Sequence, residues 1–148
     1  PEQIAVVKKW IETGARLDAG ISASAPLITI MPKPTQPNPP EAYRVPVPVT
    51  AVAVSPDGTL LATAGYREVI LWNAADGQLV RRIMNLAERP HDIAFSADGQ
   101  QLAVAAGTPG QLGEVKLFNV ADGTLVRDLF TTDDEVFSVA YSPDGTKL

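Results

Sequence analysis

The stretch Val52–Gly58 reads VAVSPDG, and this pattern returns twice along the chain. It appears as IAFSADG at Ile93–Gly99, 41 residues later, and as VAYSPDG at Val139–Gly145, a further 46 residues on. Each copy is an apolar run followed by a turn sequence. Self-similarity of this kind predicts a fold assembled from repeated units.

A second signature fixes the length of the unit. ILWNAADGQLVR at Ile70–Arg81 returns 46 residues later as KLFNVADGTLVR at Lys116–Arg127. The basic period is 41 residues, and the second unit carries five extra residues around Thr108–Gly113. We expect this insertion in a loop between two apolar runs, because added loop length costs little conformational entropy.

Four short apolar runs in each unit predict four antiparallel strands. In the first unit we expect them at Thr50–Ser55, Leu60–Ala64, Val69–Asn73 and Leu79–Ile83. Asp-Gly pairs separate the runs, and such pairs tolerate the positive φ angles of tight hairpin turns. The pairs are Asp57-Gly58, Asp76-Gly77, Asp98-Gly99, Asp122-Gly123 and Asp144-Gly145. Four short strands in a period of about 40 to 45 residues indicate propeller blades.

These residues resemble WD40 repeats in the Ser-Pro-Asp-Gly turn, the LATAG run at Leu61–Gly65 and the LWN that ends the third strand. Trp72 and Phe118, each followed by Asn, stand in the place of the family's Trp-Asp pair. The Gly-His pair that usually opens the repeat is absent, and so is the usual Asp before the Trp strand. The family's full network of Asp, His, Ser/Thr and Trp therefore cannot form. The resemblance implies an all-β, partial WD40-like propeller in which Trp72 and Phe118 pack the blades.

The repeats occupy residues 50–148, as blades at about 50–90 and 91–136 and the start of a third at 137–148. The chain runs from Pro1 to Leu148 and stops in mid-strand, so we expect a fragment. An open arc of blades would expose unpaired sheet edges. Closure of the ring therefore requires further blades or self-assembly. In closed propellers the N-terminal segment often supplies the outer strand of the last blade, and we predict this clasp for Pro40–Val49.

Two segments precede the repeats. Residues 1–18 predict one helix, with an apolar stripe at Ile4, Val7 and Ile11 and with Gly14 suited to the position after a helix end. Residues 19–49 hold eight of the thirteen prolines and predict an extended, semi-rigid linker.

The helix carries a resemblance of its own. KKWIETGARL at Lys8–Leu17 resembles the closing helix of small c-type cytochrome domains of planctomycete-type bacteria. The resemblance implies that residues 1–18 end an upstream domain that carries haem c. It also implies export to the periplasm, where c-type haem is attached. The chain contains no cysteine, so no haem attachment site lies within it.

Three further features of the sequence are candidate sites. His91 lies just before a predicted strand, and we interpret it as a structural or surface residue. Met31 lies in the linker, after the helix, so we interpret it as a linker residue rather than an axial haem ligand. Asp133–Glu135 is the densest acidic run, and without a glycine-containing calcium loop it predicts a solvated turn between blades. We assign no catalytic, cofactor-binding or metal-binding residue.

The composition argues against three further classes of function. Acidic residues outnumber basic ones 17 to 12, which disfavours an extended phosphate-binding surface for nucleic acid. No apolar run reaches the length of about 18 residues that a membrane-spanning helix needs. A single histidine argues against a histidine-based catalytic triad or metal cluster.

The favoured function is a non-catalytic propeller scaffold that binds a protein partner and is linked to a cytochrome c-type electron-transfer domain. Two alternatives stay open. One is a redox enzyme subunit whose site lies in blades outside these residues, and the other is a plain propeller binding module without haem.

Overall fold

The computed structural model describes residues 2–14, 16, 22, 24 and 35–148. The chain divides into two compact units, Pro1–Pro32 and Lys33–Leu148, which we describe separately. Met31, the linker methionine considered above, lies outside the described residues.

The first unit contains one helix, α1, at Glu2–Glu12. The helix ends well before the predicted residue 18, because Gly14 adopts a left-handed conformation with φ of 95° and its N–H bonds to the carbonyl of Ile11. The predicted apolar stripe is present, and Ile4, Val7 and Ile11 are all exposed. A helix this short is marginal in water on its own, so its stability depends on a surface that covers the stripe.

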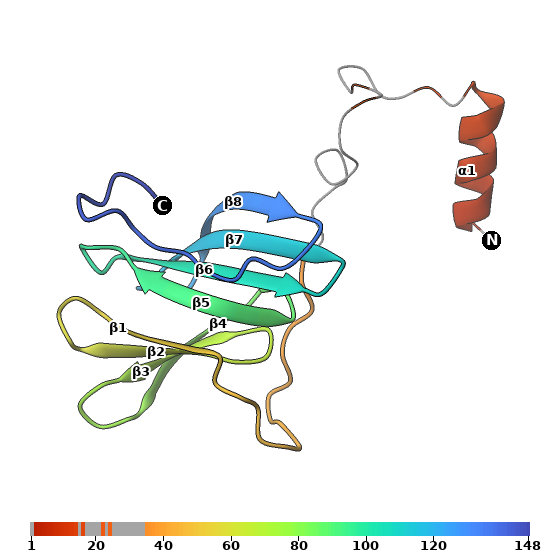
Figure 1. The fold of residues 1–148 in the computed structure, drawn as a ribbon. Helices are drawn as coiled ribbons and strands as arrows, with labels where there is room; N and C mark the ends of the chain where they lie inside the picture. Colours follow the sequence, from red (N-terminus) through yellow and green to blue (C-terminus); the bar gives the residue numbers. More distant parts are fainter. Residues whose placement is uncertain (1, 15, 17–21, 23, 25–34) are drawn as a thin grey trace. The chain divides into compact units, whose positions relative to one another are not determined.

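The second unit consists of two antiparallel four-stranded sheets, each in the strand order of the sequence (Figure 1). The first sheet contains β1 (Ala51–Val54), β2 (Leu60–Ala64), β3 (Val69–Asn73) and β4 (Leu79–Ile83). The second contains β5 (Arg89–Phe95), β6 (Gln101–Thr108), β7 (Leu112–Asn119) and β8 (Leu125–Thr132). This arrangement confirms the predicted all-β fold of two propeller blades.

The hydrophobic core lies between the two sheets. Small side chains of the first sheet, Ala62 and Ala64, are fully buried near Leu102, Val104 and Phe118 of the second sheet. Since side chains alternate along a strand, β2 and β3 turn one set toward this core and the other set away from it. The alanines allow the sheets to approach closely.

The five-residue insertion lengthens one hairpin of the second sheet. β6 and β7 each have eight residues, whereas β2 and β3 each have five. Thr108 pairs with Leu112 at the end of the longer ladder, so the added residues extend the strands as well as the loop. The prediction of a simple loop insertion was therefore only partly right.

The third repeat begins on the second sheet. Asp92 of β5 accepts hydrogen bonds from the Ser138 hydroxyl and the Val139 N–H, at 2.8 and 3.0 Å. The turn that follows is closed by a bond from the Ser142 N–H to the Lys147 carbonyl, as in the first two repeats. Residues 137–148 thus repeat the turn of the first two units and contact β5, although they form no strand.

Candidate interaction surface

The face of the first sheet that points away from the second sheet is apolar and uncovered. Val54 pairs with Leu61 and Leu61 with Trp72, so these three side chains share this face. Val52 and Val54 are 60% and 59% exposed. In the second sheet the equivalent of Trp72 is Phe118, which is 1% exposed because the first sheet covers it. A neighbouring blade therefore covers this face in the second sheet, whereas the equivalent face of the first sheet is open.

The segment before β1 turns this face into a groove. Residues 43–49 run beside the sheet and, together with side chains such as Thr63, Ile70 and Trp72, enclose a volume of 590 Å³. The Val-Pro-Val-Pro-Val sequence at 45–49 gives this wall apolar side chains. Residues 35–50 form no strand, so the clasp predicted for Pro40–Val49 stays a prediction about the closed ring.

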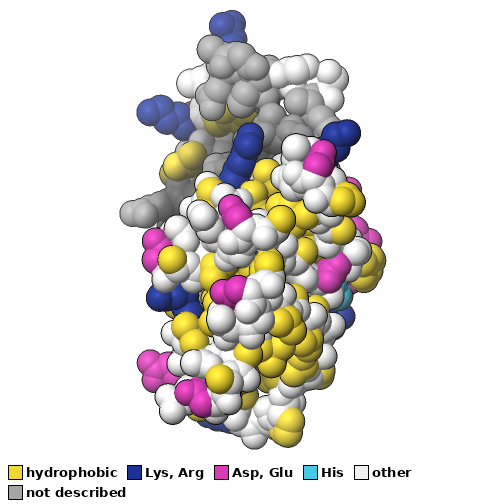
Figure 2. All heavy atoms as spheres, turned by 90° about the vertical axis from the view of Figure 1, so that its left-hand side faces the viewer, with side chains coloured by type: hydrophobic (Ala, Val, Ile, Leu, Met, Phe, Trp, Pro, Cys, Tyr) yellow, Lys and Arg dark blue, Asp and Glu magenta, His cyan; other side chains and the backbone are white. Residues whose placement is uncertain are grey.

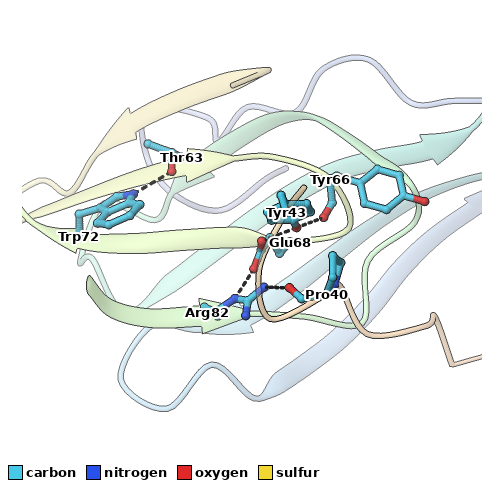
Figure 3. Close-up of polar contacts among 7 residues, drawn as sticks. All are labelled: Pro40, Tyr43, Thr63, Tyr66, Glu68, Trp72 and Arg82. Atoms are coloured by element: carbon cyan, nitrogen blue, oxygen red, sulfur yellow. Dashed lines mark hydrogen bonds and ion pairs between the residues drawn. The ribbon is translucent and has the colours of Figure 1, made fainter. Parts of the chain in front are cut away.

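A buried carboxylate anchors this segment at one end of the groove (Figure 3). Glu68 is 1% exposed and accepts hydrogen bonds from the Tyr43 hydroxyl and from Arg82 Nε, both at 2.5 Å. Arg82 also donates from Nη2 to the carbonyl of Pro40, at 2.8 Å. The Tyr43 hydroxyl lies 2.9 Å from the Tyr66 carbonyl as well. These bonds tie the proline-rich segment to the residues just before β3 and to β4.

The network also keeps the Tyr43 hydroxyl protonated. Burial, and then the hydrogen bond and negative charge of Glu68, raise the pKa of Tyr43 to about 12. The hydroxyl is therefore a stable proton donor to Glu68 at neutral pH. The guanidinium of Arg82 balances the buried carboxylate, which is the condition under which a buried charge is tolerated.

The second sheet repeats this device with different donors. Glu114, at the position of Glu68 in the repeat, accepts a bond from the Ala87 N–H and pairs with Lys116, at 2.7 and 2.8 Å. Lys116 Nζ also donates to the Asn85 carbonyl. In both blades a glutamate holds the chain segment that enters the blade; Glu68 directly precedes β3 and Glu114 lies within β7. Sequence reasoning missed both glutamates, although their separation of 46 residues matches the repeat.

Part of the polar network typical of the repeat survives. The Trp72 indole N–H donates to the Thr63 hydroxyl at 2.8 Å, between adjacent strands of the open face (Figure 3). Phe118 has no such donor and is held by packing alone. Trp72 and Phe118, which occupy equivalent positions in the repeat, thus differ in that only Trp72 adds a side-chain hydrogen bond to its packing.

The five Asp-Gly pairs all lie in tight turns. Their glycines have φ between 68° and 74°, the left-handed region that glycine adopts without strain. In three of the turns the aspartate accepts a bond from the serine two residues before it, and this bond lowers the pKa of Asp57, Asp98 and Asp144. The pKa of Asp122 is likewise lowered, chiefly by the hydrogen bond from the Thr124 hydroxyl. Asp76 accepts a bond from the Gln78 N–H.

These turns gather at one end of the sheets, because both hairpins of a four-stranded blade with Asp-Gly turns close on the same side. Figure 2 views the molecule from the left-hand side of Figure 1, where these turns lie, and shows acidic side chains set among exposed apolar ones. The aspartates bind their own turns, so their repetition is explained by folding.

His91 and the acidic run meet at the opposite end. His91 Nε2 lies 2.8 Å from Glu135 Oε1, and its ring is 4.9 Å from the ring of Phe137. Asp134 accepts bonds from the N–H groups of Gly110 and Glu135. These contacts hold residues 134–137, which lead from the second repeat into the third, against the second sheet. Among the described residues, no group of three or more His, Cys, Asp or Glu side chains could hold a metal ion.

Comparison with known proteins supports the repeat assignment. The family of the WD domain, G-beta repeat, matches residues 43–73, which run from Tyr43 of the anchored segment to the end of β3. No curated protein matches the chain. In the described part of the chain, no helix has the length and apolar character needed to cross a membrane. The match and the two sheets together give a partial WD40-like propeller, a fold that supports protein interaction.

Proposed function

We propose that this chain is part of a non-catalytic propeller scaffold, and that the open face of its first blade binds protein. The observation that carries the proposal is the contrast between the exposed face around Val54 and the covered, equivalent face around Phe118. Glu68, Tyr43 and Arg82 already satisfy one another, so what the groove offers to a ligand is largely apolar surface. Such a surface favours a protein segment over a small polar substrate.

Site-specific photo-crosslinking tests this proposal in the natural protein. A photoreactive residue at position 54 should form adducts with a peptide, and mass spectrometry should identify which polypeptide it comes from. Position 126 is the control, because Val126 is 50% exposed on the outer strand β8. Equal yields of peptide adduct at positions 54 and 126, or none at either, would reject the first blade's face as a binding surface.

A finer part of the proposal concerns the first unit. We propose that α1 closes a c-type cytochrome domain and that the whole protein is exported. The sequence around Trp10 supports this, and so does the exposed stripe at Ile4, Val7 and Ile11, which needs a covering domain. The residues present here do not fit haem c itself, because thioether attachment needs cysteine and the chain has none. Any haem would be held by another part of the protein.

The haem proposal has its own test. The natural full-length protein, denatured and free of small molecules, should keep the absorbance of covalently attached haem and should be much heavier than 15.7 kDa. A longer chain without haem absorbance would remove the electron-transfer part and leave the scaffold intact.

A further inference from the structure

The two sheets are joined at their outer rim by an arginine. Arg81 of β4 donates from Nη1 to the Asp122 carbonyl and from Nη2 to the Ala121 carbonyl, at 3.0 and 2.8 Å. These carbonyls belong to the outer Asp-Gly turn of the next sheet. The arginine stem lies across Gly123, where an added Cβ would be 2.9 Å from Arg81 Cδ. The planar guanidinium therefore donates two hydrogen bonds to adjacent carbonyls, and this contact requires the backbone shape of that turn.

The second sheet carries the same donor without its acceptor. Arg127 follows Arg81 by 46 residues, and it pairs with Leu117 as Arg81 pairs with Leu71. The two arginines thus have the same register in their blades. Arg127 is exposed, and the described residues give it no hydrogen bond or ion pair.

The first sheet carries the same acceptor without its donor. The turn at Ala75–Gly77 matches that at Ala121–Gly123, with an asparagine side chain that caps Ala75 and Ala121 alike at 2.9 Å. The glycine φ angles are 70° and 74°. Around Gly77, however, no atom lies within 4 Å of an added Cβ. The place that Arg81 fills on the second sheet is open on the first.

We infer that Arg127 is the docking residue for a third blade, and that its ligand is the pair of backbone carbonyls in that blade's outer Asp-Gly turn. Residues 137–148 already begin this blade on the second sheet, held by Asp92. The open turn at Ala75–Gly77 is the matching acceptor for an arginine on the other side of the first blade. The blade that supplies this arginine would lie on the open face of the first blade, so this part of the inference rests on the proposed function. The contact of Arg127 with a third blade continues an interface present in the chain and is independent of partner binding and of haem.

The chemistry makes this contact selective for blades of the same type. A lysine offers one compact charge and cannot donate two parallel bonds in a fixed plane, so Arg→Lys should not replace the contact. A residue larger than glycine in the turn would meet the arginine stem and would also strain the positive φ. Each blade therefore selects a neighbour with an Asp-Gly outer turn.

A tandem chain tests the inference with an internal control. Residues 1–136 followed directly by residues 50–148 place Arg127 of the first copy beside the open Ala75–Gly77 turn of the second copy, in repeat register. Arg127 of the second copy has no complete blade after it. The same substitution, Arg127→Ala, can thus be compared at two positions in one molecule, with Arg81→Ala as the reference.

We expect Arg127→Ala in the first copy to lower the melting temperature by about 4 °C, close to the effect of Arg81→Ala. Arg127→Lys should not restore it. In the second copy Arg127→Ala should leave the melting temperature unchanged. The inference is overturned if the first-copy substitution is silent while Arg81→Ala is not, or if the two copies respond equally. Because failure of the blades to dock also makes the first-copy substitution silent, that outcome counts against the inference.

Discussion

Replacing Glu68 by glutamine tests how the proline-rich segment is held. The carboxylate is 1% exposed and has two donors, the Tyr43 hydroxyl and Arg82 Nε. Hydrogen bonds to a charged group contribute about 1.5–3 kcal/mol each, well above the value for neutral pairs. The Arg82 side chain is 25% exposed, so water recovers part of its loss when the charge is removed.

We therefore expect Glu68→Gln to lower the free energy of unfolding by about 2–3 kcal/mol, near the lower end of the sum of two such bonds. This is a large fraction of a typical domain stability of about 5–15 kcal/mol. Urea unfolding followed by circular dichroism measures it, and an unchanged m-value would show that the same surface is exposed on unfolding.

The matched control is Glu88→Gln. Glu88 pairs with Arg67 at 3.8 Å, and their side chains are 33% and 18% exposed. A partly exposed pair at this longer distance contributes about 0–1 kcal/mol. If Glu68→Gln costs no more than Glu88→Gln, the buried carboxylate does not anchor the segment and our reasoning about the groove wall fails.

Three other predictions concern alkaline pH, acid pH and the core. The pKa of Tyr43 is raised to about 12 in the folded chain, from an ordinary value of 10.0. The contribution of Tyr43 to stability is therefore complete below pH 10 and is lost as the pH rises toward 12. Tyr43→Phe should flatten the fall in melting temperature over this range, whereas Tyr66→Phe should not. The hydrogen bond from Ser96 lowers the pKa of Asp98 below 3.8, so the contribution of Asp98 to stability is present above that pH and is lost at lower pH. Ser96→Ala should reduce the loss of melting temperature below pH 3.8. An unchanged dependence of melting temperature on acid pH would contradict this. Phe118→Ala removes a ring that is 1% exposed between the sheets and should cost about 3–5 kcal/mol in urea unfolding, and a cost below 1 kcal/mol would place the ring outside the core.

Much of the fold could be predicted because the sequence repeats itself. The ranges expected for Leu60–Ala64, Val69–Asn73 and Leu79–Ile83 are those of β2, β3 and β4. In each case a short run rich in apolar residues is bounded by turn sequences, and a similar run returns in the second unit. A single short apolar run could belong to a strand or a helix, and its return at a fixed spacing favours the strand.

The helix end was harder to place. The apolar stripe suggested a helix to residue 18, but a single glycine, Gly14, ends it through its left-handed φ of 95°. The sequence itself marks Gly14 as suited to the position after a helix end. A local conformational preference here outweighed the apolar pattern beyond it.

The anchoring network could not be predicted from local patterns. Tyr43, Glu68 and Arg82 are separated by 25 and 14 residues and belong to three different segments. Nothing in the spacing within any one segment shows that they meet. The repeat does give a signal for the glutamates, since Glu68 and Glu114 occupy the same place. The donors differ, because Pro46, which aligns with Ala87, has no N–H to give.

The most direct test of the central claim is the accessibility of the first blade's face in the natural protein. The chain has no cysteine, so Val54→Cys and Val126→Cys each introduce one reactive thiol into it. In the isolated chain both sites should react with a maleimide, because Val54 and Val126 are 59% and 50% exposed. In the natural protein, with labelled positions read by mass spectrometry, we expect position 54 to be protected and position 126 to stay reactive. Equal labelling of the two positions there would contradict the claim that this face is a protein-binding surface.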